Sequence, residues 1–147
     1  MRFLFYDRVD IIEKGSSIRG VKSFALSEEF LRGHFSKVAL VPGVILIEAM
    51  AQLLGWLIIY THDFKLSSIM TLVEDVKMSS NLRPGFQAEI QGEIISSSKM
   101  DSLGRAFISV DGEPIASMDR IIYSNFHKVD PDELKEKFRY YSGFSNR

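Results

Sequence analysis

The sequence predicts an α+β domain in which an antiparallel β-sheet curls around one long buried helix. Residues 44–60 form a nearly unbroken apolar run headed by Pro42-Gly43, which is typical of a helix buried on all sides. Short segments of alternating polarity follow this run and are separated by turn residues, as in antiparallel strands. A sheet with free edges cannot close around a helix alone, so we expect pairing of two copies into a homodimer.

The strands are expected on both sides of the helix. One is predicted before it, and four after it, over residues 17–26, 68–78, 87–96, 105–110 and 114–123. Asp111-Gly112 predicts a type I′ hairpin between the last two strands, because both central positions of that turn require positive φ. Ser27 is expected to cap a short helical turn over residues 27–31.

A second helix is predicted near the C-terminus. Residues 130–133, Asp-Pro-Asp-Glu, combine an N-cap, a proline at the first helical position and acidic residues in the first turn. The helix should run to about residue 141, with Leu134, Phe138 and Tyr141 on one face. We expect this face to pack against the body of the domain rather than to bind a partner.

Composition excludes several classes of function. The chain has 147 residues, 46% of them hydrophobic, and this is enough for one domain with one core. Its 18 Lys and Arg balance 19 Asp and Glu, so no overall field attracts nucleic acid or an anionic membrane. The absence of cysteine excludes disulfides, thiolate nucleophiles and cysteine zinc sites. The three histidines are not at ligand spacings, so we expect no metal and no cofactor.

Targeting signals are also weak. The N-terminus is interrupted by Arg2, Asp7 and Arg8 before any apolar run reaches the length of a signal peptide. Residues 44–60 are slightly short for a membrane span and contain Glu48. We therefore expect a cytoplasmic protein without a membrane span.

Glu48 and Gln52 are the unusual residues of the apolar helix. Burial would favour the protonated form of the Glu48 carboxyl group and make it a plausible proton donor. Gln52 lies four residues later on the same face, where its amide can hydrogen-bond the acid. A purely structural pair that satisfies itself at an interface explains the spacing equally well.

His34 and Gly43 complete a candidate constellation. An imidazole can accept a proton near neutral pH, although a loop histidine is often only a hydrogen-bonded bystander. The free N–H groups at the helix start suit an oxyanion, and Gly43 lets a carbonyl approach the backbone closely. A base, an acid and an oxyanion site together match the loss of water from a β-hydroxyacyl thioester.

These residues resemble a known motif. His34-Phe35, Pro42-Gly43-Val44 and residues 48–52, Glu-Ala-Met-Ala-Gln, are similar to the 3-hydroxyacyl-[acyl-carrier-protein] dehydratases of the FabZ type, in the FabZ/FabA-like hot-dog family. The likeness extends from Asp7-Arg8-Val9 to residues 110–112, Val-Asp-Gly. It implies a hot-dog dehydratase-like domain over residues 1–123. Residues 124–147 are then a C-terminal extension with a short helix, which we expect to be part of the same single domain.

The resemblance implies a role for each candidate. His34 would remove the α-proton, Glu48 would protonate the leaving hydroxyl group, the Gly43 amide would bind the thioester carbonyl, and Gln52 would steady the acid. In such enzymes the histidine of one subunit faces the glutamate of its dimer mate, and trimers of dimers are common. The substrate arrives on the phosphopantetheine arm of an acidic acyl carrier protein, and the acyl chain lies in a tunnel at the dimer interface.

The sequence also departs from that pattern. Ser36, Lys37 and Ala39 stand where the family has a Pro-Gly pair and a second proline, and the later family motifs have drifted at Met78 and Phe86. We expect these changes to affect the tunnel and the surface more than the chemistry. Fatty acid synthesis and a specialised aryl polyene or polyketide-like lipid pathway are therefore both open, as is an additional double-bond isomerase activity.

Two alternative functions remain at this point. A hot-dog thioesterase would use the helix carboxylate to activate water but generally lacks the histidine. A non-catalytic acyl-binding subunit would have no obvious reason to keep a costly carboxylate at position 48.

Overall fold

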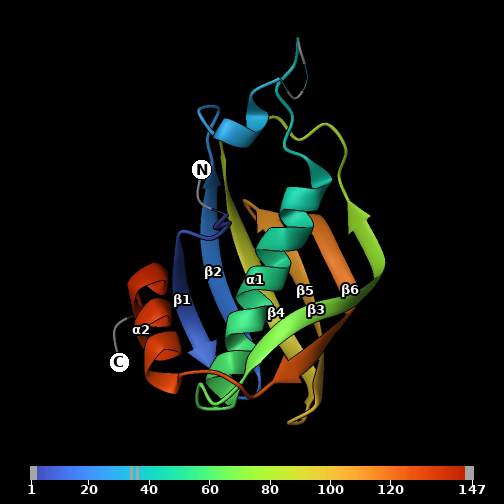
Figure 1. Ribbon diagram of the computed structural model, residues 1–147. Coiled ribbons are helices and arrows are strands. Elements are labelled where there is room, and N and C mark those ends of the chain that lie inside the picture. Colours follow the sequence, from blue (N-terminus) through green and yellow to red (C-terminus); the bar gives the residue numbers. More distant parts are fainter. Residues whose placement is uncertain (1–2, 34, 36, 145–147) are drawn as a thin grey trace.

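The computed structural model describes residues 3–33, 35 and 37–144 (Figure 1). A six-stranded antiparallel sheet in the order β1-β2-β4-β5-β6-β3 curves around the central helix α1, which spans Gly43–Thr61. The sequence-based prediction of an α+β fold is confirmed. The strands are β1 (Arg8–Glu13), β2 (Ser17–Phe24), β3 (Ser67–Met78), β4 (Phe86–Ser97), β5 (Asp101–Val110) and β6 (Glu113–Phe126).

The predicted strands all form, but β1 was missed. Its sequence RVDIIE mixes charged residues with apolar ones, and an irregularity between Val9 and Ile11 breaks the alternation, so only Val9 is fully buried. Strand β5 begins at Asp101, four residues before the predicted start at Arg105. The hairpin prediction is confirmed, because Asp111 (φ 51°) and Gly112 (φ 82°) both adopt positive φ between β5 and β6.

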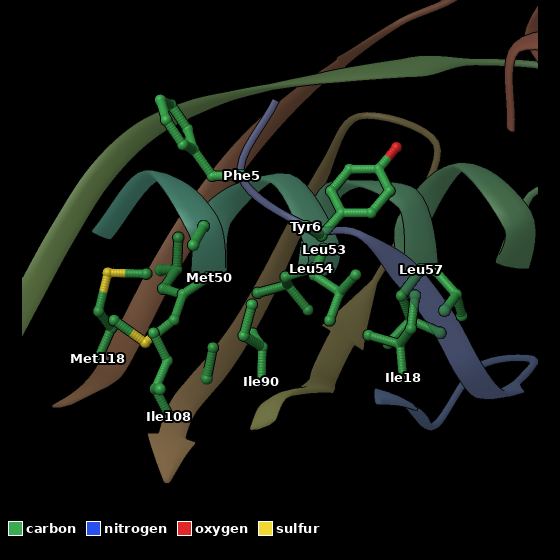
Figure 2. Close-up of a cluster of buried hydrophobic side chains, with 14 of the residues drawn as sticks. Phe5, Tyr6, Ile18, Met50, Leu53, Leu54, Leu57, Ile90, Ile108 and Met118 are labelled. Atoms are coloured by element: carbon green, nitrogen blue, oxygen red, sulfur yellow. The ribbon is translucent and has the colours of Figure 1, made fainter. Parts of the chain in front are cut away.

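Helix α1 packs closely on the sheet at three positions where glycines of the strands face it. A Cβ atom at Gly92 on β4 would lie 3.3 Å from Leu54, and one at Gly104 on β5 would lie 2.8 Å from the same side chain. Leu53 fills the corresponding space beside Gly20 on β2. Figure 2 shows the resulting cluster of buried side chains from α1, the strands and the N-terminal segment. The centre of the core is thus built from leucines of α1 set into hollows of the sheet.

The face of α1 that points away from the sheet is less covered. By length and composition α1 could cross a membrane, but half of its most apolar stretch is buried inside the fold. The exposed part includes Val44, whose relative accessibility is 69%. Strands β1 and β3 form the two edges of the sheet.

The predicted C-terminal helix is α2, Pro131–Ser142. The Asp130 side chain accepts hydrogen bonds from the Asp132 and Glu133 amides at 3.0 and 3.3 Å, and Gly143 ends the helix at φ 63°. Phe138 is buried and lies with its ring centroid 5.3 Å from that of Trp56 on α1. The predicted packing of α2 against the body of the fold is confirmed.

Candidate functional site

A groove of about 670 Å³ runs along the open face of α1. Glu48, Gln52, Gly55 and Ile59 follow one another at helical spacing along this groove. Its other walls come from the N-terminal segment, the start of β3, the end of β6 and helix α2, which contribute Phe3, Leu4, Tyr6, Ser68, Met70, Tyr123, Lys137 and Tyr141, while Ala51 and Trp56 belong to α1. Met50, between Glu48 and Gln52 in the sequence, is fully buried in the core.

Glu48 and Gln52 form the pair that the helical spacing predicts. The Gln52 Nε2 atom donates to Glu48 Oε1 at 3.1 Å. The same amide is fixed from its other side, because Gln52 Oε1 accepts from the Phe5 amide at 2.9 Å and Nε2 donates to the Phe3 carbonyl at 3.2 Å. The N-terminal segment therefore holds Gln52, and Gln52 directs the carboxylate.

The expectation that Glu48 is buried is corrected by the structure. Its side chain is only partly covered, because it lies in the wall of the groove rather than among the core leucines. A single copy of the chain thus leaves this carboxylate in contact with solvent. Any stronger desolvation has to come from a ligand or a second copy.

The start of α1 offers a free donor and an unexpected neighbour. Within the described part of the chain the Gly43 amide has no hydrogen-bond partner, as expected for the first residue of a helix. A Cβ atom at Gly43 would overlap with the Met78 Sδ atom at the end of β3. Met78, one of the departures from the family pattern, therefore lies against the expected oxyanion site and not at a distance from the chemistry.

The position of His34 lies outside the described residues, so its predicted role stays a prediction. The preceding turn is η1 (Glu29–Leu31), which begins after Glu28 without a side-chain cap, so the Ser27 cap was wrong. Lys22 Nζ, itself largely buried, donates to Glu28 Oε1 at 2.9 Å and holds this turn on β2. On the far side of the loop, the Val41 amide donates to the Leu82 carbonyl at 2.8 Å.

Three tyrosines line the groove, and two of them, Tyr6 and Tyr123, were not among the residues that the sequence singled out. The Tyr123 hydroxyl donates to the Ala51 carbonyl at 2.7 Å, and burial, followed by the nearby Glu48 charge, raises the pKa of Tyr123. The Tyr6 hydroxyl accepts from Trp56 Nε1 at 2.8 Å, and burial raises the pKa of Tyr6 to about 12. Both phenols remain neutral at ordinary pH. The alternation of β6 indicated that Tyr123 could face inward, but nothing local placed it beside α1.

No group of three or more His, Asp or Glu side chains suited to a metal ion occurs among the described residues. The polar side chains that line the groove are a carboxylate, an amide, a serine hydroxyl, phenols, an indole and a lysine.

Comparison with known proteins identifies the family. The model of the FabA-like domain matches residues 1–119. The chain is 32% identical over 114 residues to the 3-hydroxyacyl-[acyl-carrier-protein] dehydratase FabZ of Caldicellulosiruptor saccharolyticus, covering 77% of this chain and 81% of the relative. It is 29% identical over 118 residues to FabZ of Halalkalibacterium halodurans, covering 80% and 84% of the two chains.

Solved structures show the same fold at low sequence identity. A hot-dog-like protein from Thermanaerovibrio acidaminovorans superposes with a TM-score of 0.63 at 14% identity, over 92% of this chain and 96% of that one. The dehydratase heterocomplex ApeI:P from Xenorhabdus doucetiae gives a TM-score of 0.65 at 16% identity, over 84% and 99% of the two chains. With its curved sheet around α1 and the match over residues 1–119, the chain belongs to the FabA-like family of hot-dog proteins.

Proposed function

We propose that this protein is a hydro-lyase that dehydrates a 3-hydroxyacyl thioester, carried on acyl carrier protein, to the trans-2-enoyl thioester. The observation that carries the proposal is the Glu48 carboxylate, held by Gln52 in the wall of a groove with room for an acyl chain. The FabZ relatives, which are named for this activity, support the same reaction.

In the proposed mechanism each group has one task. His34 removes the α-proton, and the electron pair passes through the enolate to form the Cα–Cβ double bond. The Gly43 amide, which has no partner in the described structure, donates to the thioester oxygen while charge builds up there. Glu48 gives its proton to the β-hydroxyl group, which leaves as water, and Gln52 keeps the carboxyl group directed toward it. Return of the proton from His34 to Glu48 closes the cycle.

We further propose that a homodimer is the catalytic unit, as the resemblance implies, and trimers of dimers are a larger possible assembly. The open sheet edge at β3 and the uncovered face of α1 support this proposal, because a second copy would cover both. Active sites shared between copies predict complementation between two inactive variants. A mixture of refolded His34→Ala and Glu48→Gln chains should regain activity, because one site of each mixed dimer then carries both native residues. A mixture no more active than its parts would contradict a shared site.

The reaction itself is tested by ultraviolet absorbance. A purified sample given a 3-hydroxyacyl thioester should develop the absorbance of a conjugated enoyl thioester, and His34→Ala should abolish it. Release of free thiol without that absorbance would instead support a thioesterase. Binding without either product, across carrier-bound substrates of several lengths, would support a non-catalytic acyl-binding subunit.

The carrier protein is expected to dock near the loop before α1, where Arg32, Lys37 and Arg83 are all exposed. Lys37→Glu should raise KM for carrier-bound substrate, increasingly so at low salt, and spare a pantetheine thioester. Equal effects on both substrates would exclude docking at Lys37. Comparing ordinary short 3-hydroxyacyl chains with aryl-polyenoyl chains on the carrier would decide between fatty acid synthesis and the specialised pathway proposed as its alternative.

A further inference from the structure

We propose that helix α2 forms the far end of the acyl groove and that Tyr141 limits the length of the acyl chain this protein accepts. This inference rests on the proposed function, since it assigns the groove beside Glu48 to an acyl thioester. It concerns a part of the molecule that lies beyond the match to the FabA-like domain, which ends at residue 119. The limit is therefore expected to be a property of this chain rather than of the matched segment.

The groove has a reactive end and a distal end. Glu48 lies in the second turn of α1, and Ile59, in the last turn, lines the same groove. Eleven residues separate them, which corresponds to roughly 16 Å along the helix axis. An extended chain advances roughly 3.5 Å for every three single bonds, so this length accommodates on the order of a dozen bonds.

Helix α2 contributes the wall at the distal end. Lys137 and Tyr141, one turn apart on α2, both line the groove. Phe138, which lies between Lys137 and Tyr141 in the sequence, packs its ring against Trp56. Lys137 and Tyr141 therefore lie on the side of α1 that carries Trp56. Tyr141 and the N-terminal residue Tyr6 line the same groove.

This wall is firmly anchored. The Phe138 ring lies 6.0 Å from Tyr60 and 5.8 Å from Phe64, measured between centroids, in addition to its contact with Trp56. Ser142, the last residue of α2, is completely buried. A ligand therefore meets a fixed surface of α2 rather than a loose tail, and displacing it would expose these aromatic rings to water.

The chemistry of the distal end also opposes a longer apolar chain. The Trp56 indole N–H donates a hydrogen bond to the Tyr6 hydroxyl at 2.8 Å, and this pair forms one polar edge of the groove's distal end. The exposed Lys137 ammonium lies one turn from Tyr141 at the rim. Methylene groups beyond Tyr141 would no longer contact apolar side chains and would approach the hydrated Lys137 ammonium group. They would therefore gain no further burial.

The test uses Trp56, the single tryptophan of the chain, as a reporter inside the groove. Saturated acyl-pantetheine thioesters from butanoyl to hexadecanoyl are titrated while tryptophan fluorescence is recorded. Affinity should rise about fourfold for each added methylene group up to a limiting length and then stay constant. Tyr141→Ala should move the limit to longer chains, and Lys137→Met should strengthen binding of the longest chains alone.

Two further variants serve as controls. Tyr141→Phe keeps the ring and should keep the limit, and Arg139→Ala removes a long exposed side chain of α2 that does not line the groove. Thermal unfolding verifies that each variant is folded. The same limit in Tyr141→Ala as in the native protein, or no dependence on length at all, would overturn the inference.

Turnover of the matching 3-hydroxyacyl thioesters separates this inference from the proposed function. A limit that moves in Tyr141→Ala although no thioester is dehydrated would support the inference and refute the dehydratase. Dehydration with an unchanged chain-length limit would support the dehydratase and refute the inference.

Discussion

The two ends of α1 differ in how completely the chain covers them. At the N-terminal end the Gly43 amide is without a described partner, Val44 is 69% exposed and Glu48 is only half-buried. At the C-terminal end Trp56 and Tyr60 lie within an aromatic cluster closed by Phe138 of α2. One helix thus carries open polar groups at its start and an aromatic cluster anchored by α2 at its end. The comparison teaches that the groups to which we assign the chemistry and the contacts that anchor α2 lie at opposite ends of a single helix.

Glu48→Gln is expected to separate activity from stability most clearly. If the N-terminal end is reactive and contributes little to stability, this change should lower kcat about a thousandfold, in the range typical of a lost general acid, and leave thermal unfolding unchanged. Absorbance of the enoyl product measures the first quantity and circular dichroism the second. Glu113→Gln, at the exposed β5–β6 turn, is the matched control and should be as active as the native protein.

The opposite result is expected from Phe138→Ala at the C-terminal, anchored end of α1. Removing this buried ring should cost about 3 kcal/mol in the free energy of unfolding, because it leaves a cavity among Trp56, Tyr60 and Phe64. Urea denaturation measures the loss, and faster hydrogen exchange of the α2 amides would localise it. Tyr140→Ala, on a residue that is 72% exposed, should cost far less. Equal losses in the two variants would mean that α2 is not anchored through Phe138.

The next largest effect is expected from alkaline pH, which should weaken the packing at the anchored end of α1. Burial raises the pKa of Tyr6 from its ordinary value of about 10 to about 12. Its contribution is fully present below about pH 10, and it is lost as pH rises through about 12, because the unfolded chain ionises first. The full loss should be about 3 kcal/mol for this one group, and about half of it should occur between about pH 9 and about pH 11.

Urea denaturation at about pH 9 and about pH 11 tests this dependence. Tyr6→Phe is the control: it forfeits the hydrogen bond to Trp56 at both pH values but should show a shallower decline between them. A decline as steep as that of the native protein would assign the effect to another group.

The smallest effect is expected at the open end, from Gly43→Ala. The new Cβ atom collides with the Met78 thioether, which is flexible enough to move, so we expect a cost of about 1 kcal/mol in unfolding free energy. In a Met78→Ala background the same change should be neutral. This double-mutant cycle measures the coupling directly. Additive effects would show that Met78 does not restrict Gly43.

The sequence predicted the elements that depend on local patterns. The uninterrupted apolar run located α1, Asp111-Gly112 located a hairpin, and Asp130 with Pro131 located α2. Strand β1 was not predicted, because it forms through pairing with β2 and its own composition does not favour a strand. The Ser27 cap failed because the turn begins two residues later.

The candidate site was predictable only in part. Helical spacing placed Gln52 on Glu48, and the structure confirms that contact. The clamp on Gln52 by the backbone of Phe3 and Phe5 depends on contacts across more than forty residues, which no local pattern reports. The same holds for Tyr123 on Ala51 and for Met78 against Gly43.

The strand order described above also bears on how the chain folds. Strands β4, β5 and β6 are neighbours in sequence and in space, whereas β2 pairs with β4 only after α1 and β3 have been enclosed between them. Closing such a long loop is slow, so we expect the β4–β6 meander to be protected first in pulsed hydrogen exchange, and β1 and β2 last. The N-terminal segment that clamps Gln52 is attached to these late strands. The protein would therefore acquire a sheet well before Gln52 can hold the Glu48 carboxylate in place.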